Sequence, residues 1–192
     1  MSTRSRIGIV RDSNARKIVV ESVYCHFDGY PDGVGQMLLD HWTDPAKVEH
    51  LISLGDLSSL GSEIGEKHDF DKHLPDYWAD PVKDMLEKLS DDEAAELRRQ
   101  LEVESPHGKG WCNFYRRDRG ETECDSRVHD MDNWPDYGQE AEYLFQPNLR
   151  EWRVRRQDFN PVGWNTVTPW DGWIPIPEAI ALEASANEEV SA

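Results

Sequence analysis

Histidine and carboxylate side chains lie close together in the segment Cys25–Tyr30, directly before a loop dense in glycine. If a strand ends at Phe27, His26 and Asp28 point to the same side of it, and the glycines permit close backbone approach to a ligand. The amides of the helix that follows can hold an anion. This pattern predicts a small-molecule or phosphate pocket, with the imidazole as general acid or base. The candidate ligand-binding residues here are His26, Asp28, Tyr30, Gly33, Gly35 and His41.

Two other interpretations of this segment stay open. Asp28 can instead accept hydrogen bonds from loop amides while His26 is satisfied locally, which would make the cluster a turn-stabilising network. Alternatively, His26, Asp28 and His41 could serve a metal-dependent hydrolase. The sequence contains no serine nucleophile elbow, Walker loop or dinucleotide-binding fingerprint. We therefore expect a protein that is not an enzyme and that carries neither a metal nor another cofactor.

Arginine is concentrated late in the chain, with eight of the fourteen arginines between residues 116 and 156. A guanidinium group binds phosphate through parallel hydrogen bonds, and rings such as Tyr115 and Trp152 could stack on a base. Arg117 and Arg119 therefore join the candidate ligand-binding residues. The alternative is internal salt bridging with the acidic neighbours Asp118, Glu121, Glu123 and Glu151.

A second group of possible metal ligands is His107, Cys112, Cys124 and His129. Two sulfur and two nitrogen ligands could hold tetrahedral zinc. Neither a Cys-x-x-Cys pair nor the usual histidine spacing is present, so the cysteines can equally be small apolar fillers. An odd number of cysteines, three in all, indicates reduced thiols rather than a disulfide scaffold.

The elements that must position these residues begin with two β-rich runs, at residues 7–10 and 18–24. Turn-forming residues at 12–14 separate them, which predicts an antiparallel hairpin. A helix is predicted from about Gln36. A second helix is predicted from Pro45, with a cap before it, to a stop at Gly55.

Further along, helical spacing from Pro81 and a capping-box pattern at Ser90–Glu93 predict two more helices. The runs 143–145 and 152–155 predict another hairpin, with Trp152 and Val154 on one face. Together the elements predict an α+β fold: a small antiparallel sheet with helices packed on one face and an acidic helical insertion in the middle.

A chain of 192 residues has room for one domain with a proper core. We expect a single α+β domain over 1–175, with the acidic insertion at about 62–108, followed by a short helix and polar tail over 176–192. No apolar run is long enough to span a membrane, and the first residues lack the apolar stretch of a secretory signal. We therefore expect a cytoplasmic protein.

Acidic residues outnumber basic ones by 38 to 21, for a net charge of −17. Such a surface repels nucleic acid and suits a partner protein with a basic surface. Part of the excess lies in the predicted helices of the insertion, where the candidate partner-binding residues are Asp84, Glu87, Asp91, Asp92, Glu93 and Glu96. The alternative is an acidic surface that serves only solubility.

Several ordered motifs resemble a family of small bacteriophage proteins known only as hypothetical. They are Thr3–Ser5, Tyr24–Tyr30, Gly33–Gly35, Leu51–Leu60, Tyr115–Glu121 and the hairpin from Tyr143 to Trp152. Two departures from the family pattern are Phe27 in place of tryptophan and a longer segment at about 61–110. The resemblance implies a phage genome and an accessory role, and it implies no chemistry.

These observations favour a phage accessory protein that binds and inhibits a host factor, such as a defence system or a nucleic-acid enzyme. Its acidic helices would resemble the phosphate array of DNA to a basic partner in the host cytoplasm. The alternatives are a binder that sequesters a nucleotide or another small anionic ligand, and the metal-dependent hydrolase.

Overall fold

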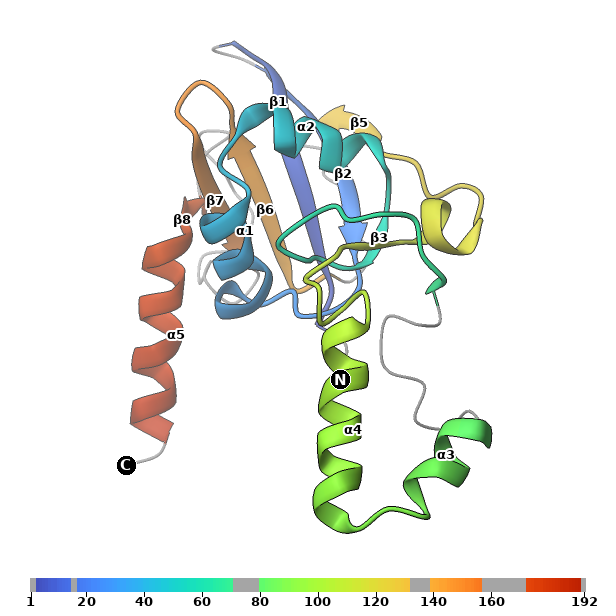
Figure 1. Ribbon diagram of the computed structural model, residues 1–192. Helices are drawn as coiled ribbons and strands as arrows, with labels where there is room; N and C mark the ends of the chain where they lie inside the picture. Colours follow the sequence, from blue (N-terminus) through green and yellow to red (C-terminus); the bar gives the residue numbers. More distant parts are fainter. Residues whose placement is uncertain (1–2, 15–16, 71–79, 132–138, 157–171, 191–192) are drawn as a thin grey trace.

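The computed structural model describes residues 3–14, 17–70, 80–131, 139–156 and 172–190. Its centre is a mixed sheet in the order β4-β3-β2-β1-β6-β7-β8, with β5 also paired to β2 (Figure 1). The strands are β1 Ser5–Asn14, β2 Lys17–Cys25, β3 Leu57–Ser59, β4 Asn113–Phe114, β5 Arg127–Asp130, β6 Ala141–Gln146, β7 Glu151–Arg156 and β8 Ile174–Pro175. With the helices that pack on it, the sheet forms the predicted α+β fold.

The first two strands form the predicted hairpin at the middle of the sheet. Their antiparallel pairing sets Ile7 opposite Val23, with a bulge after Val10. Because side chains alternate along a strand, Ile7 and Ile9 enter the main core while Arg6 faces the opposite side.

The sheet differs from the predicted antiparallel arrangement at two of its pairings. β6 runs parallel to β1, with Ile7 opposite Tyr143, and β3 runs parallel to β2 beside Cys25. The predicted hairpin of β6 and β7 is antiparallel, with Tyr143 opposite Val154. Periodicity specifies hairpins because they are local. It does not specify how strands joined by a long connection meet, because that depends on the path of the chain between them.

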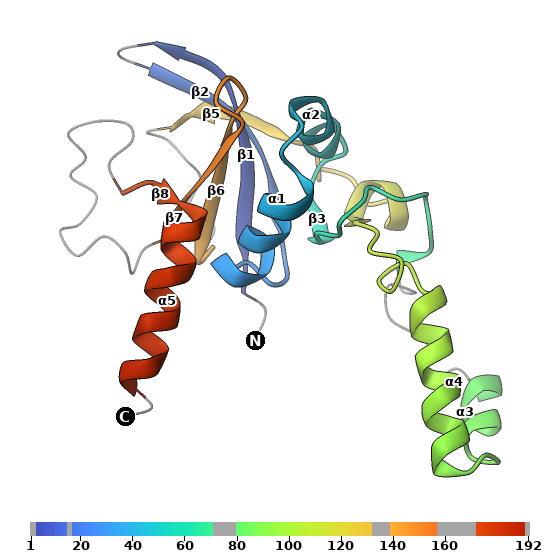
Figure 2. The ribbon, with the colours of Figure 1, turned by 60° about the vertical axis from the view of Figure 1, so that its left-hand side comes forward.

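The helices that pack on the sheet cover one of its faces (Figure 2). They are the π-helical turn η1 Pro31–Gly35, α1 Gln36–His41, α2 Pro45–Ser53 and α5 Ile176–Val190. Asp44 caps α2 as predicted, accepting hydrogen bonds from the amides of Ala46 and Lys47. The α5 helix continues the domain beyond residue 175, because Ile176 and Ala179 are buried in the main core.

Two tryptophans tie the helical layer to the sheet. Trp42, at the end of α1, donates its indole N–H to the carbonyl of Gly61 at 2.9 Å. Trp152 on β7 donates to the carbonyl of Trp42 at 2.7 Å and packs on Phe145. Both indoles are buried with their polar edge satisfied, as a core tryptophan requires.

The acidic insertion is a helical hairpin, α3 Asp80–Leu86 and α4 Asp91–Glu104, which projects away from the sheet (Figure 1). Ser90 and Glu93 form the predicted capping box. At the base of this arm the chain closes on itself, because Glu63 and Gly110–Cys112 exchange backbone hydrogen bonds. None of the described helices is both long and apolar enough for a membrane span.

Gly55 ends α2 with a φ of +85°, and a Cβ there would lie 2.2 Å from the carbonyl oxygen of Cys124. Gly120 provides a matched control, because its φ is +78° and a Cβ there meets open space. We expect Gly55→Ala to lower the free energy of unfolding by more than about 3 kcal/mol and Gly120→Ala by about 1 kcal/mol. Urea unfolding measures both values. Equal losses would contradict the close approach at Gly55.

Candidate functional site

The strand β2 ends at Cys25, two residues before the predicted end, and this separates His26 from Asp28. The backbone amides of His26 and Phe27 donate to Leu57 and Ser58 of β3. Asp28 then adopts a φ of +57°, a conformation that carries the chain away from the strand. His26 and Asp28 consequently line different hollows of the surface.

Asp28 belongs to a hollow of ≈ 490 Å³ around the glycine loop. Three carboxylates line it, from Asp28, Asp32 and Asp40, and no arginine or lysine is among its described lining residues. Such a lining repels anions, so the geometry does not favour phosphate here. Tyr30, also in the lining, donates its hydroxyl to the Asp28 carboxylate at 3.2 Å.

The glycines of this loop serve packing within the domain. A Cβ at Gly33 would lie 2.4 Å from the carbonyl oxygen of Asp28, and one at Gly35 would press on Ile176 and Tyr143. The amides of the π-helical turn are also engaged, since Val34 donates to the Asp28 carbonyl and Gly33 to that of Tyr30. The loop therefore matches the turn-stabilising alternative more closely than an anion cradle.

The predicted metal ligands lie apart. His41 is exposed at the end of α1 and lines neither hollow, so it does not join His26 and Asp28. Within the described ranges, no three His, Cys, Asp or Glu side chains form a group that could hold a metal ion. This includes His107, Cys112, Cys124 and His129. Burial raises the pKa of the Cys112 thiol to about 12, and its sulfur accepts a hydrogen bond from the amide of Gly61.

Arg117 forms the most extensive network of the predicted ligand-binding arginines. It pairs with Asp118 at 2.7 Å and donates to the carbonyl oxygens of Ile64, Gly65 and Cys112. The Asp118 side chain is fully buried and accepts the amide of Phe114 at 2.8 Å. Arg117 therefore holds the loop after β3 against β4, and this role occupies the donors that a ligand would need.

Most other arginines of the cluster also bridge to carboxylates of the same chain, as in the salt-bridging alternative. The pairs are Arg116–Asp125, Arg119–Glu121, Arg153–Glu151, Arg155–Glu142 and Arg156–Glu183. Arg119 also lies over the ring of Phe70, 5.0 Å from its centroid. The sequence cluster thus disperses over the surface and does not form a single pocket.

A second hollow, of ≈ 360 Å³, gathers three arginines. Arg127 belongs to the late arginine cluster that the sequence indicated, whereas Arg4 and Arg6 were not among the predicted candidates. Its lining residues are Arg4, Arg6, Tyr24, His26, Asp56 and Arg127. Arg6, Tyr24 and Arg127 lie on β1, β2 and β5. The others are directly beside strands, because Arg4 precedes β1, His26 follows β2 and Asp56 precedes β3. The set is separated by up to 123 positions. One signal was available in the sequence: Arg4 and Arg6 alternate with the core residues Ile7 and Ile9, which places them on the other face of the strand.

Hydrogen bonds fix the polar groups of this arginine hollow. The Tyr24 hydroxyl lies 2.8 Å from Nδ1 of His26, and the Tyr24 amide donates to the Asp56 carboxylate at 2.6 Å. Arg6 is 1% exposed and donates to Ser22 Oγ. Burial raises the pKa of Asp56 above its ordinary value, against the Tyr24 hydrogen bond and the charges of Arg6 and Arg127.

The roles of Arg117 and its neighbour Arg116 can be separated by truncation. Arg117→Ala strands the buried Asp118 carboxylate, so we expect a loss of about 3–5 kcal/mol of unfolding free energy. Arg116→Ala removes an exposed ion pair and should cost less than about 1 kcal/mol. Denaturant titration measures both. An Arg117→Ala protein as stable as the Arg116→Ala control would show that the network is not structural.

His129, on β5 beside Val20, gives a pH-dependent prediction. Burial, followed by the charge of Arg6, lowers the pKa of His129 to about 4. The unfolded chain, with an ordinary pKa near 6.5, binds the proton more readily, so the imidazole contributes a loss of stability as pH falls from about 6.5 to about 4. We expect His129→Gln to reduce that loss by about 1–2 kcal/mol, allowing for solvent screening. The exposed His50→Gln is the control, and identical pH profiles for both variants would contradict a buried neutral imidazole.

No protein-family model, curated protein or solved structure matches this chain. The resemblance to small bacteriophage proteins therefore stays a prediction. Two surfaces of the molecule bear on its function: the acidic helical arm formed by α3 and α4, and the arginine hollow.

Proposed function

We propose that the protein is a phage accessory factor that binds a host protein through the α3–α4 arm and thereby inhibits it in the host cytoplasm. The observation that carries the proposal is an apolar groove with an acidic rim on a part of the fold that projects from the sheet. The helices α1 and α2 and the first turns of α5 pack on the core, whereas the groove between α3 and α4 is open. An accessory inhibitor needs such a presented surface.

The groove has a volume of ≈ 450 Å³ and runs between the two helices of the arm. Its apolar part is formed by Met85, Leu89 and Leu97. Met85 is 52% exposed, and Val103 farther along α4 is 53% exposed. The apolar floor of the groove is therefore accessible to a side chain of a partner.

Acidic side chains surround this apolar floor. Asp92, Glu93 and Glu96 line the groove directly. Asp84 on α3, Glu87 in the turn after it and Asp91 on α4 are also exposed. Hydrogen bonds from Ser90 lower the pKa of Glu93, and those from Arg99 and Gln100 lower the pKa of Glu96, so both carboxylates stay ionised at neutral pH. Residues 80–104 contain nine acidic and four basic residues, a net charge of −5.

This combination favours a particular kind of partner surface. The phosphate array of DNA presents charge without an apolar centre, whereas here the charges flank an apolar floor. The complement is a basic amphipathic helix that sets apolar side chains into the groove and lysines or arginines against the rim. Resemblance to DNA would then account for the charge but not for the exposed Met85.

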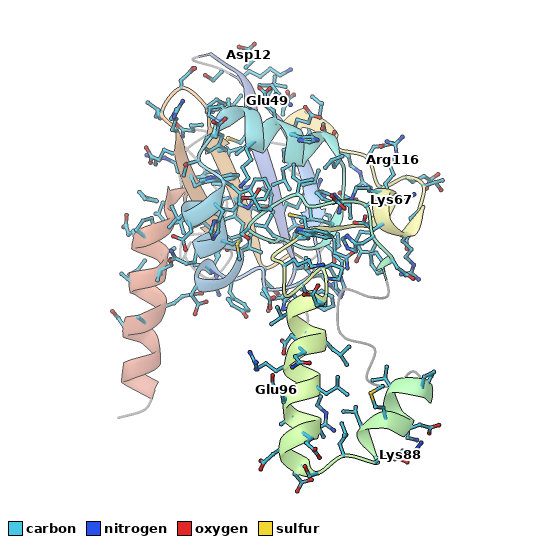
Figure 3. All side chains as sticks on the ribbon, viewed as in Figure 1. Asp12, Glu49, Lys67, Lys88, Glu96 and Arg116 are labelled. Atoms are coloured by element: carbon cyan, nitrogen blue, oxygen red, sulfur yellow. The ribbon has the colours of Figure 1, made fainter. Side chains whose placement is uncertain are left out.

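Charge reversal on the arm tests the proposal. We compare the triple variant Asp84→Lys, Glu87→Lys, Asp92→Lys with a control triple, Asp12→Lys, Glu66→Lys, Glu178→Lys, which has the same net charge. Glu93 is left intact because it belongs to the capping box. Asp12 is on the first hairpin, at the opposite end of the molecule from the arm. Glu96, on α4, shows the position of the arm (Figure 3).

The tagged parent and both variants are used to capture partners from host lysate, with identification by mass spectrometry and affinity measured on the purified partner. We expect the control triple to capture the same partner as the parent protein and the arm triple to lose it. For the purified partner, the dissociation constant of the arm triple should be at least about tenfold higher than that of the parent. If both triple variants retained the partner equally, the arm would not be its binding surface.

Substitution of one apolar side chain then distinguishes a partner helix that inserts into the groove from a partner that recognises only the acidic charges. Met85→Ser changes no charge and affects a side chain that is already half exposed. If a basic amphipathic helix inserts into the groove, the variant should weaken binding about tenfold. Unchanged affinity, together with loss in the arm triple, would favour resemblance to DNA phosphates instead.

A further inference from the structure

We infer that the arginine hollow, lined by Arg4, Arg6, Tyr24, His26, Asp56 and Arg127, binds the phosphate group of a small phosphomonoester of nucleoside monophosphate size. The site is separate from the acidic arm, and none of its residues contributes to the groove there. It also differs from the ligand site predicted at the glycine loop, with which it shares only His26.

Charge is the first argument for this ligand class. The lining carries three guanidinium groups and one carboxylate, and the carboxylates of Glu140 and Asp125 lie close to lining residues. In a chain with 38 acidic and 21 basic residues, a hollow lined by three arginines and one acidic residue departs from the overall composition. A phosphomonoester near neutral pH carries close to two negative charges, and guanidinium groups bind its oxygens with parallel hydrogen bonds.

Fixed geometry is the second argument. Arg6 cannot follow a ligand into solvent, because it is 1% exposed and its Nε and Nη2 atoms contact Ser22 Oγ at 3.2 and 2.9 Å. The backbone of Arg4 is anchored at the mouth by Glu140, whose carboxylate accepts the Arg4 amide at 2.9 Å. The buried guanidinium group of Arg6 is therefore fixed before a ligand binds, whereas the exposed side chains of Arg4 and Arg127 can adjust to the ligand.

The remaining lining residues favour an organic phosphate over a bare ion. The volume of ≈ 360 Å³ lies within the range of small-molecule pockets and exceeds what a single phosphate fills. Tyr24 and His26 present rings on one wall, held by the 2.8 Å contact between the Tyr24 hydroxyl and Nδ1 of His26. In the tautomer that accepts this hydroxyl on Nδ1, the imidazole carries its proton on Nε2 as a donor.

Asp56 sets the orientation of such a ligand. Its carboxylate is held by the Tyr24 amide at 2.6 Å, and the charges of both Arg6 and Arg127 act on it. A phosphate oxygen therefore has to share these guanidinium groups from the open side of the hollow. The same carboxylate offers an acceptor to a ribose or sugar hydroxyl, which a phosphate ion lacks.

The test uses the full-length protein and isothermal titration calorimetry with two probes, inorganic phosphate and a panel of nucleoside monophosphates, at low ionic strength. The variants are Arg127→Gln and Arg4→Gln, both at exposed positions, with Arg116→Gln as the matched control. Arg116 lies on η3 Tyr115–Arg119 and is outside the lining of the hollow (Figure 3). Arg6 is left intact because its removal would disturb a buried site.

We expect at least one monophosphate to bind at least about tenfold more tightly than inorganic phosphate. Arg127→Gln and Arg4→Gln should each weaken that binding about tenfold, and Arg116→Gln should leave it unchanged. Equal affinity for inorganic phosphate and for every monophosphate would contradict the claim that the hollow recognises the organic part of the ligand. No binding of any probe, or binding that all three variants retain, would overturn the site. Neither result bears on partner capture by the arm, whose residues are untouched.

Discussion

The burial of the Arg6 guanidinium in the middle of the sheet determines the character of one whole face of the fold. A charge out of water costs several kcal/mol unless it is paired, so the side chains around it have to be polar. Ser22 accepts its hydrogen bonds, and its charge acts on Asp56, Glu142 and His129. Around Arg6 this face holds a polar network, while the described helices of the main layer cover the opposite face, which is apolar.

Arg6 also explains why the second face has only a small core. The apolar residues there are Ile18, Val20, Met131, Leu144 and Trp173, gathered toward one end of the sheet. Between them and the arginine hollow lies the buried pair of Arg155 and Glu142, 2.6 Å apart. The guanidinium of Arg155 lies over Trp173, so the pair joins the polar and apolar parts of this face.

Local features of this fold could be predicted from the sequence because neighbouring residues determine them. The two hairpins, the Asp44 cap, the capping box at Ser90 and the stop at Gly55 all depend on a few consecutive residues. The parallel pairings of β1 with β6 and β2 with β3 could not be predicted. They join strands through long connections whose path no periodicity records.

The same distinction applies to the candidate sites. The acidic arm is contiguous in sequence, so its charge and its helices could be predicted from the order of residues alone. The arginine hollow assembles Arg4, Arg6 and Arg127 from β1 and β5, both of which pair with β2. Of the arginines clustered between residues 116 and 156, Arg127 lines the hollow, whereas Arg117 is bound to a carboxylate and to carbonyl oxygens elsewhere. Density along the chain is a poor guide to density in space when strands alternate their faces.

The division of charge follows from these arrangements. Most arginines of the late cluster are consumed in ion pairs within the chain, whereas acidic residues remain in excess on the surface and dominate the arm. A macromolecule that approaches from outside therefore meets negative charge first, and a basic surface is the one that is attracted. The same acidic surface repels a small anion at long range. Favourable electrostatic interaction begins only within the hollow, where three guanidinium groups are close to the anion and solvent screens their charges less. The two proposed surfaces would thus select partners of opposite charge and very different size, so that binding at one would not compete with binding at the other.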